Sequence, residues 1–382
     1  MVRLALAMLV RDRSRWYGLV IALAFTAFIL TQQPGTLLGV IARTTAMIDA
    51  MRDVDVWVMD PHVRYVDDLQ PLPDGALHRV RGVAGVAWAS PYFKGSARVR
   101  LADGRVETSE LYAFDGATLV GAPTAIVTGT RAALRRPDAV LVDRLGAARL
   151  GAGVDGSARA LVPGDVVELN DARAQIVGVV EAPPAFQSLP RLYTTWDRIR
   201  RFVPAERRML SFVLVRVARG QDPAIVARAI EARTGLRART AADFAGDTRR
   251  YFVRSSGVLL TFYVITAVAV GIGLFIAAQT FQNFVIENLR HYGALAAMGA
   301  DQATMRRMVV AQAVVAGAHG TGLGVGGAAL TTLASAGTET ASRIEPWQVG
   351  ATTVAMLVVC ASVAAISLRR VRRLEPAAVF RS

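Results

Sequence analysis

The sequence has one cysteine, Cys360, and one lysine, Lys94. A single cysteine excludes an internal disulfide and any metal site built from several cysteines. Because its only lysine lies outside any G-x-x-x-x-G-K-[ST] pattern, the chain lacks the loop that grips the phosphates of ATP. The zinc motif H-E-x-x-H and the serine-hydrolase motif G-x-S-x-G are also missing. We therefore predict no catalytic site, no resident metal and no cofactor.

Acidic and basic residues are missing from four long apolar stretches of this 382-residue chain, of which 53% is hydrophobic. The stretches are residues 16–42, 255–285, 309–338 and 346–368. Each exceeds the roughly 20 residues that cross a bilayer core. The sequence therefore predicts an integral membrane α-helical protein with four transmembrane helices. The lack of charge inside the spans argues against a proton- or ion-coupled pump. His319 lies inside the third span, where a histidine either packs or hydrogen-bonds between helices or takes part in a proton relay.

The N-terminal region combines a basic flank with the first apolar stretch. Residues 1–15 carry four arginines and predict a short interfacial helix in the cytoplasm. The stretch at residues 16–42 is longer than the core of a signal peptide, which favours an uncleaved span. We expect this span to end or to kink at Pro34, which follows two glutamines.

Residues 43–254 have the composition of a soluble domain, and their pattern predicts a large α+β domain with helices at both ends. Val54, Val56 and Val58 alternate with other residues, as in a half-buried strand. Hairpins are predicted at Asp103-Gly104 and Asn170-Asp171, and a further strand at residues 209–217. A helix is expected from Asp222-Pro223 to Gly235. Helices at residues 37–51 and 241–254 would form a stalk that joins the domain to the membrane. Asp60, His62 and Asp67 could form a metal site, or they could be turn residues around Pro61.

Arginines flank the spans unevenly, which predicts their orientation. Four lie in the N-terminal segment, three in the loop at residues 286–308 and five in the tail at residues 369–382, whereas the loop at residues 339–345 has one. Both termini and the 286–308 loop are therefore predicted to be cytoplasmic, and the large domain extracytoplasmic. The net charge of +14 follows from this topology and does not indicate nucleic-acid binding. In the third span, Gly320/Gly324 and Gly322/Gly326 have the G-x-x-x-G spacing that permits close helix contact.

The loop at residues 286–308, which we call the coupling loop, predicts a short amphipathic helix. Leu289, Tyr292, Leu295 and Met298 recur at every third residue and form an apolar stripe. Gly299 can end this helix, and the following Asp301 can cap the next one. The pattern alone leaves two interpretations open. The helix docks against a cytoplasmic protein, or it lies passively among the lipid headgroups.

The coupling loop contains the segment ENLRHYGALAAMGA. This segment is similar to the pattern E-x-x-x-E-[IY]-G-x-L-[KR]-A-[ML]-G-A, and through it the chain resembles the permease subunits of ABC transporters of the MacB/FtsX/LolE type. The matching residues are Glu287, Tyr292, Gly293, Leu295, Ala297, Met298, Gly299 and Ala300. His291 and Ala296 replace the usual acidic and basic residues. The ending RRVRRLEPAAVF also resembles the family, and residues 55–58 and 192–200 are similar to its DevC-like branch.

The resemblance implies a homodimer in the bacterial inner membrane that docks on a separate ABC ATPase. The docking residues would be Glu287, Leu289, Tyr292, Gly293, Leu295, Met298, Gly299 and Ala300. ATP hydrolysis by that partner would move the stalk and the periplasmic domain, an action called mechanotransmission. DevC-like relatives imply export of a lipid or another amphiphile with a periplasmic adaptor and an outer-membrane channel. Two alternatives stay open: an FtsX-like subunit that controls a periplasmic cell-wall hydrolase, and a membrane-tethered enzyme.

Overall fold

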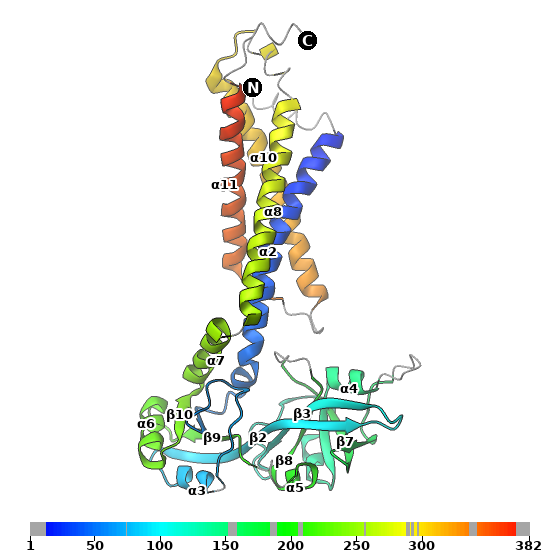
Figure 1. Cartoon of the computed structure of the whole chain (residues 1–382), viewed down its shortest axis with the longest axis vertical. Coiled ribbons are helices and arrows are strands. Elements are labelled where there is room, and N and C mark those ends of the chain that lie inside the picture. Colours follow the sequence, from blue (N-terminus) through cyan, green and yellow to red (C-terminus); the bar gives the residue numbers. More distant parts are fainter. Residues whose placement is uncertain are drawn as a thin grey trace. The chain divides into compact units, whose positions relative to one another are not determined.

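The computed structural model (Figure 1) describes residues 13–73, 75–151, 159–183, 189–204, 209–255, 257–287, 291, 294–295, 298–335 and 342–371. The chain divides into two compact units. One, the helical unit, comprises Met1–Val40 and Gly257–Ser382, and the other, the sheet unit, comprises Ile41–Ser256. The boundaries predicted for the large domain, residues 43 and 254, lie two residues inside this division at each end.

The helical unit is built from long helices. They are α2 (Arg13–Ala50), whose last turns belong to the sheet unit, α8 (Gly257–Glu287), α10 (Gln302–Ala334) and α11 (Pro346–Val371). Among the described residues, three stretches are long and apolar enough to cross a membrane: Trp16–Ala50, Leu260–Phe284 and Ala303–Ala334. In α11 the apolar stretch that is described, Pro346–Ser362, is shorter. By length and composition these helices are candidate membrane spans, and the number four stays a prediction.

Helix α2 passes through Pro34 without a break, so the helix does not end there, whereas a kink at Pro34 stays a prediction. A proline inside a helix removes its own backbone hydrogen bond, and its ring clashes with the carbonyl group of residue i−4. At this level the helix is also held from outside. Gln32 Oε1 accepts a hydrogen bond from Thr331 Oγ1 at 3.0 Å, and the Gly35 carbonyl accepts one from the Arg343 N–H at 3.0 Å. Such contacts with neighbouring helices allow a membrane helix to tolerate proline.

Buried threonines on α2 bond to the other helices of this unit. Thr26 Oγ1 donates to the Gly273 carbonyl of α8 at 2.8 Å, and Thr31 Oγ1 donates to Thr352 Oγ1 of α11 at 3.1 Å. Lipid cannot satisfy a polar group, so hydrogen bonds between helices help to fix their packing. Apolar side chains from α2, α8, α10 and α11 pack between them, including Leu23, Phe284, Val309 and Met356.

The glycines of α10 have two different surroundings. A Cβ atom on Gly320 would lie 2.5 Å from Leu23 Cβ, and one on Gly324 would lie 2.3 Å from the Ala24 carbonyl oxygen. These two glycines therefore let α10 lie directly against α2. A Cβ atom on Gly322 or Gly326 would meet nothing within 4 Å. The second G-x-x-x-G pair therefore borders open space in this chain.

The sheet unit contains ten strands among its described residues. They are β1 (Val56–Met59), β2 (Val86–Arg100), β3 (Val106–Phe114), β4 (Ala125–Gly129), β5 (Ala139–Asp143), β6 (Val166–Leu169), β7 (Ala172–Glu181), β8 (Arg191–Thr195), β9 (Phe212–Val217) and β10 (Arg237–Thr240). Strands β10, β1, β9 and β2 form an antiparallel layer in that order. The second half of β2 also pairs with β3, and the order of paired strands then runs through β8, β5 and β7 to β6. Strand β6 pairs in turn with the end of β2. These six strands close into a small barrel that shares β2 with the layer.

Short helices connect and cover the strands. They are α3 (Ala76–Arg81), α4 (Arg144–Gly151), α5 (Ile199–Phe202), α6 (Pro223–Thr234) and α7 (Ala241–Ser255), with 3-10 turns η1 (Arg131–Arg135) and η2 (Trp196–Arg198). Helices α3 and α6 pack on one face of the four-stranded layer through Val80 and Ile230. Phe244 of α7 and Ile48 of α2 pack on the opposite face. The α+β fold predicted for this domain is confirmed.

Strand β1 is buried on both faces, so the prediction of a half-buried strand is wrong. Val56 and Val58 face α3 and α6, as the alternation suggested. Trp57 and Met59 point the other way but are also fully buried. Trp57 lies 5.3 Å from Phe212 and 5.7 Å from Phe244, measured between ring centroids. The reason is that α7 and the end of α2 cover a face that the pattern assigned to solvent.

Local turn chemistry follows the sequence closely. The hairpin at Asp103-Gly104 joins β2 to β3, and Gly104 has φ +86°. Asn170 and Asp171 have φ values of +47° and +64° in the turn from β6 to β7, as asparagine and aspartate tolerate. Asp222 caps α6 by accepting the Ala224 N–H at 2.8 Å, and the helix ends at Gly235 with φ +69°. These predictions, and those of the strand at β9 and the helix at α7, are confirmed.

Candidate functional site

The coupling loop connects α8 to α10, and part of it is described. Leu289, Tyr292 and Gly293 lie outside the described residues, as do residues 1–12 and 372–382. Glu287 is the last residue of α8. Leu295 is half-buried, Ala300 is half-buried, and Met298 is 74% exposed. The proposed docking stripe therefore stays a prediction.

The turn between this loop and α10 is well defined by backbone contacts. Gly299 has φ +89°, and the Ala300 N–H donates to the Leu295 carbonyl at 3.0 Å. This is the pattern of a helix ended by a glycine in the left-handed conformation. Asp301 then caps α10 by accepting the Thr304 N–H at 3.0 Å. The hydrogen bonds from Thr304 hold the pKa of Asp301 below its ordinary value. Glycine is required here because other residues are strained at this φ.

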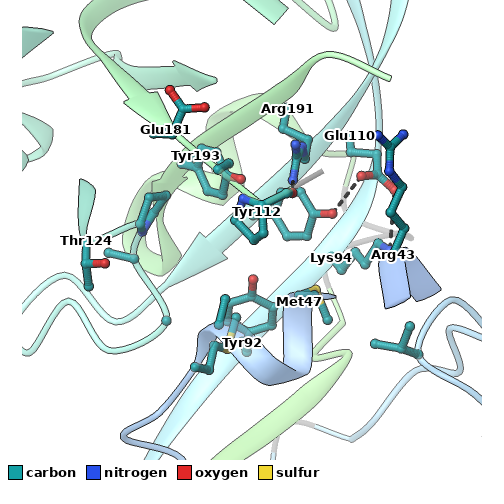
Figure 2. Close-up of a pocket in the computed structure, with 18 of the residues that line it drawn as sticks. Arg43, Met47, Tyr92, Lys94, Glu110, Tyr112, Thr124, Glu181, Arg191 and Tyr193 are labelled. Atoms are coloured by element: carbon teal, nitrogen blue, oxygen red, sulfur yellow. Dashed lines mark hydrogen bonds and ion pairs between the residues drawn. The ribbon is translucent and has the colours of Figure 1, made fainter. Parts of the chain in front are cut away.

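A second candidate site lies in the sheet unit, where three neighbouring strands present pairs of side chains on one face. The pairs are Tyr92 and Lys94 on β2, Glu110 and Tyr112 on β3, and Arg191 and Tyr193 on β8 (Figure 2). Successive side chains of a strand point to opposite faces, so residues two apart share a face. The strand register places Lys94 beside Tyr112, Tyr112 beside Tyr193, and Glu110 beside Arg191.

Lys94 is the centre of a buried ion cluster. Its ammonium group bonds to Asp67 and lies 3.3 Å from Glu110 Oε1. Tyr112 donates its hydroxyl proton to Glu110 Oε2 at 2.6 Å. The side chain of Lys94 is 8% exposed and that of Glu110 is 10% exposed. Charges that are so deeply buried are stable only when they are paired, so this cluster fixes the side-chain arrangement around it.

Arg191 is the second buried cation of this face. Its guanidinium lies 3.4 Å from Asp143 Oδ2 and donates to the Pro183 carbonyl. Within the described part of the chain, its Nε atom has no hydrogen-bond partner although the side chain is only 7% exposed. Burial raises the pKa of Asp143 above its ordinary value even though Arg191 opposes the shift. The guanidinium is therefore incompletely satisfied by the protein.

These side chains line a cavity of about 110 Å³. The last turns of α2 form its wall through Arg43, Thr44, Met47 and Ala50, together with Met51, which follows the helix. Ala122 and Pro123 complete its apolar lining, and Thr124 and Glu181, both exposed, mark its opening to the surface. The sheet unit thus combines a small amphipathic cavity with a helix that also belongs to the helical unit.

The three tyrosines of the cavity are arranged as a row. Tyr112 and Tyr193 stack with centroids 5.2 Å apart, and Tyr92 lies 6.3 Å from Tyr112. Burial raises the pKa of each of them above the ordinary value near 10. Their hydroxyls are therefore protonated at neutral pH. The Tyr112 hydroxyl donates to Glu110, whereas those of Tyr92 and Tyr193 can donate into the cavity. The motifs Y-x-K, E-x-Y and R-x-Y in the sequence indicate that each pair of side chains shares one face of its strand. They do not indicate that the three strands pair with one another.

The structure also places the candidate metal ligands around His62 and the histidine of the third apolar stretch, His319. Asp60 Oδ1 lies 2.8 Å from His62 Nδ1, whereas Asp67 bonds to Lys94. Among the described residues no group of three or more His, Cys, Asp or Glu side chains could hold a metal ion. His319 packs edge-on against Trp16 with ring centroids 5.6 Å apart, and its Nδ1 atom lies 2.8 Å from the Val315 carbonyl. These contacts agree with the packing interpretation of His319.

Comparison with known proteins gives two family matches. The model of the MacB-like periplasmic core domain matches residues 18–233, and that of the FtsX-like permease C-terminal region matches residues 263–376. No curated protein matches the chain.

Two solved structures are similar to the sheet unit at low sequence identity. One is the periplasmic region of MacB from Actinobacillus actinomycetemcomitans, with 11% identity, a TM-score of 0.39, and coverage of 52% of this chain and 96% of that chain. The other is the extracellular domain of the noncanonic ABC-type transporter YknZ from Gram-positive bacteria. It has 13% identity, a TM-score of 0.34, and coverage of 49% of this chain and 98% of that chain.

Proposed function

Because the chain belongs to the family of FtsX-like permeases with a MacB-like periplasmic core domain, we propose that it couples ATP hydrolysis by a separate ATPase to movement of its outer domain. Members of this family are membrane-embedded permease components of ABC transporters, and they normally work with an ABC ATPase. The sheet unit is then the periplasmic domain, and the coupling loop is the docking site for the ATPase on the cytoplasmic side.

The observation that carries this proposal is how the stalk helices are fixed in the sheet unit. Ile48, near the end of α2, and Phe244, near the start of α7, belong to the same hydrophobic core as Trp57 and Phe212. Farther along α7, Asp247 pairs with Arg237 at 2.7 Å, and Tyr251 stacks on Tyr65 with centroids 4.0 Å apart. A force applied along either helix would therefore move the domain, since packed interiors deform little.

We propose further that the transporter is a homodimer that exports a lipid or another amphiphile through a periplasmic adaptor and an outer-membrane channel. The absence of charged residues in the apolar spans supports transport outside the bilayer core. The match to the MacB-like periplasmic domain over residues 18–233 favours a transporter over the FtsX-like signalling alternative. The DevC-like branch remains the expected subgroup.

The test is purification of the tagged chain in mild detergent with trapped nucleotide, followed by identification of the proteins that accompany it. Recovery of an ABC ATPase is expected, together with a periplasmic adaptor. A matched pair of variants, Gly299→Pro and Gly299→Ala, then probes the coupling loop. Proline cannot adopt φ +89°, whereas alanine is strained there by about 1 kcal/mol, so the proline variant should lose the ATPase more completely. Tyr292→Ala should weaken the association in the same way.

Three results would count against the proposal. Failure to recover any ATPase would contradict the docking role of the coupling loop. Equal recovery with wild type, Gly299→Pro and Tyr292→Ala would show that the ATPase binds elsewhere. Recovery of a cell-wall hydrolase in place of the adaptor would support the signalling alternative. In each case, flotation with membranes checks that the variant chain is inserted normally.

A further inference from the structure

The cavity of the sheet unit has a combination of groups that ion pairing within the protein does not explain. It is lined by the guanidinium of Arg191, by three tyrosines, and by apolar side chains of α2 and of residues 122–123. Figure 2 shows the guanidinium directed toward Tyr112 and Tyr193, and the hydroxyl of Tyr92 directed toward the same space from the opposite side. We propose that this cavity binds the head of a small carboxylate-bearing amphiphile.

The polar groups available to a ligand are donors. Arg191 uses one nitrogen on the Pro183 carbonyl and another on Asp143, which leaves its buried Nε atom without a described partner. A carboxylate placed beside the guanidinium in the cavity would form charge-assisted hydrogen bonds with it, which are stronger than bonds between neutral groups. The hydroxyls of Tyr92 and Tyr193 can donate to the same oxygen atoms.

The carboxylates that line the cavity are already engaged. Asp67 and Glu110 share Lys94, and Glu110 also accepts the Tyr112 hydroxyl. Glu181 pairs with Arg144 at 2.9 Å and points away from the tyrosines in Figure 2. These pairs reduce the repulsion that an entering carboxylate would meet.

A cationic ligand fits the same space poorly. The carboxylates of the lining that could bind an ammonium group are already paired, Asp67 and Glu110 with Lys94 and Glu181 with Arg144. The aromatic face that could bind a cation is also occupied, because Lys94 Nζ lies 5.8 Å from the centroid of the Tyr112 ring. The donors that remain, on Arg191, Tyr92 and Tyr193, therefore favour a negatively charged ligand.

The size of the cavity sets the size of the bound group. An engineered apolar cavity of about 150 Å³ holds one benzene molecule. A space of about 110 Å³ therefore accommodates a carboxylate and a few methylene groups. Met47 of α2, Met51 after this helix, and Val66 provide the apolar contact. Any longer chain would leave through the opening beside Thr124.

The test uses the full chain in phosphatidylcholine nanodiscs and radiolabelled hexanoate in equilibrium dialysis at pH 7, with empty nanodiscs subtracted. Saturable binding of one hexanoate per chain is expected, and unlabelled hexan-1-ol and hexylamine should compete poorly. Because no ATPase is present, the result is independent of the proposed coupling to ATP hydrolysis.

Two variants locate the binding. Tyr193→Phe removes one hydroxyl and keeps the ring, and it should weaken binding about tenfold, as expected for a lost hydrogen bond to a charged group. Ala122→Leu fills the apolar lining and should abolish binding. The matched control is Tyr251→Phe, which removes a hydroxyl outside the cavity and should bind as wild type does.

The outcomes decide the proposal. Absence of saturable binding overturns it, and so does equal competition by hexan-1-ol, which would show that the carboxylate is not recognised. Unchanged binding by both Tyr193→Phe and Ala122→Leu would place the hexanoate elsewhere. If one of these variants fails to fold, as checked by thermal unfolding, the other provides the decision.

Discussion

The single lysine of the chain, Lys94, carries an ammonium group that is buried between two carboxylates, so its loss should strongly affect stability. Lys94→Met keeps most of the volume but leaves Glu110 and Asp67 without their cation. Removing one partner of a buried pair typically costs about 3–5 kcal/mol. We expect a loss of this order in the free energy of unfolding, measured by denaturant titration of the detergent-solubilised chain.

The matched control for Lys94→Met is Arg100→Met. Arg100 lies 3.7 Å from Glu168, but the two side chains are 54% and 41% exposed. Pairs on the surface contribute about 0–1 kcal/mol, so this variant should unfold almost as wild type does. If both variants lost the same free energy of unfolding, the buried ion pairs of Lys94 would contribute no more to stability than an exposed pair does.

Asp68 gives a prediction for pH at the residue scale. Burial alone would raise its pKa, but hydrogen bonds from the side chain and backbone of Arg64 hold the pKa below the ordinary value. A lowered pKa contributes stability that is present above the unfolded value near 3.9 and is lost as the pH falls through the folded value. The Tm difference between wild type and Asp68→Asn should therefore be larger at pH 6 than at pH 3. A difference that does not change with pH contradicts this assignment.

At the scale of elements, the two glycine pairs of α10 offer an internal comparison. Gly324→Ala would place a Cβ atom 2.3 Å from the Ala24 carbonyl and 2.7 Å from Ala27 Cβ, so α2 and α10 would have to separate. Overpacking of this kind costs about 1–3 kcal/mol. The Cβ atom of Gly326→Ala meets nothing within 4 Å, so this variant should be neutral or more stable by up to about 1 kcal/mol, because alanine favours the helix more than glycine does. In thermal unfolding in detergent, only Gly324→Ala should have a lower Tm than the wild type. A loss in both variants would indicate that the open face of α10 is covered by another chain.

Elements whose signals are local could be predicted from the sequence. Asp222 and Gly235 bound α6 because capping needs only neighbouring backbone groups, and Asn170-Asp171 makes its turn for the same reason. Strand β1 was misjudged because the burial of Trp57 depends on α7, which lies far away in the sequence. Helix α2 continues past Pro34, where α10 and the segment before α11 support it through hydrogen bonds that no local pattern predicts.

The candidate site shows the same limit more strongly. The sequence indicates of Lys94 only that it lies outside any ATP-binding loop. Its partners Asp67 and Glu110 come from other segments, and Arg191 joins them through the parallel pairing of β8 with β3. Such pairing is not encoded by a local pattern, because the loops that allow it can have many lengths. The coupling loop, in contrast, could be recognised because its family motif is continuous.

At the scale of the whole molecule, the predicted orientation rests on the arginines beside the spans. The N-terminal segment, the coupling loop and the tail carry many, whereas the loop at residues 339–345 carries one. The energetic basis is that arginine-rich loops are retained in the cytoplasm, whereas long domains are translocated largely regardless of charge. The sheet unit can therefore be basic and still lie outside.

The single cysteine makes this orientation testable by labelling. In a Cys360→Ala background, Ile225→Cys places a thiol on α6, where Ile225 is 55% exposed, and Met298→Cys places one in the coupling loop, where Met298 is 74% exposed. A membrane-impermeant maleimide should label Ile225→Cys in intact spheroplasts and Met298→Cys only after permeabilisation. The reverse pattern would invert the topology. Labelling of both positions in intact spheroplasts would place the coupling loop outside and remove its access to a cytoplasmic ATPase.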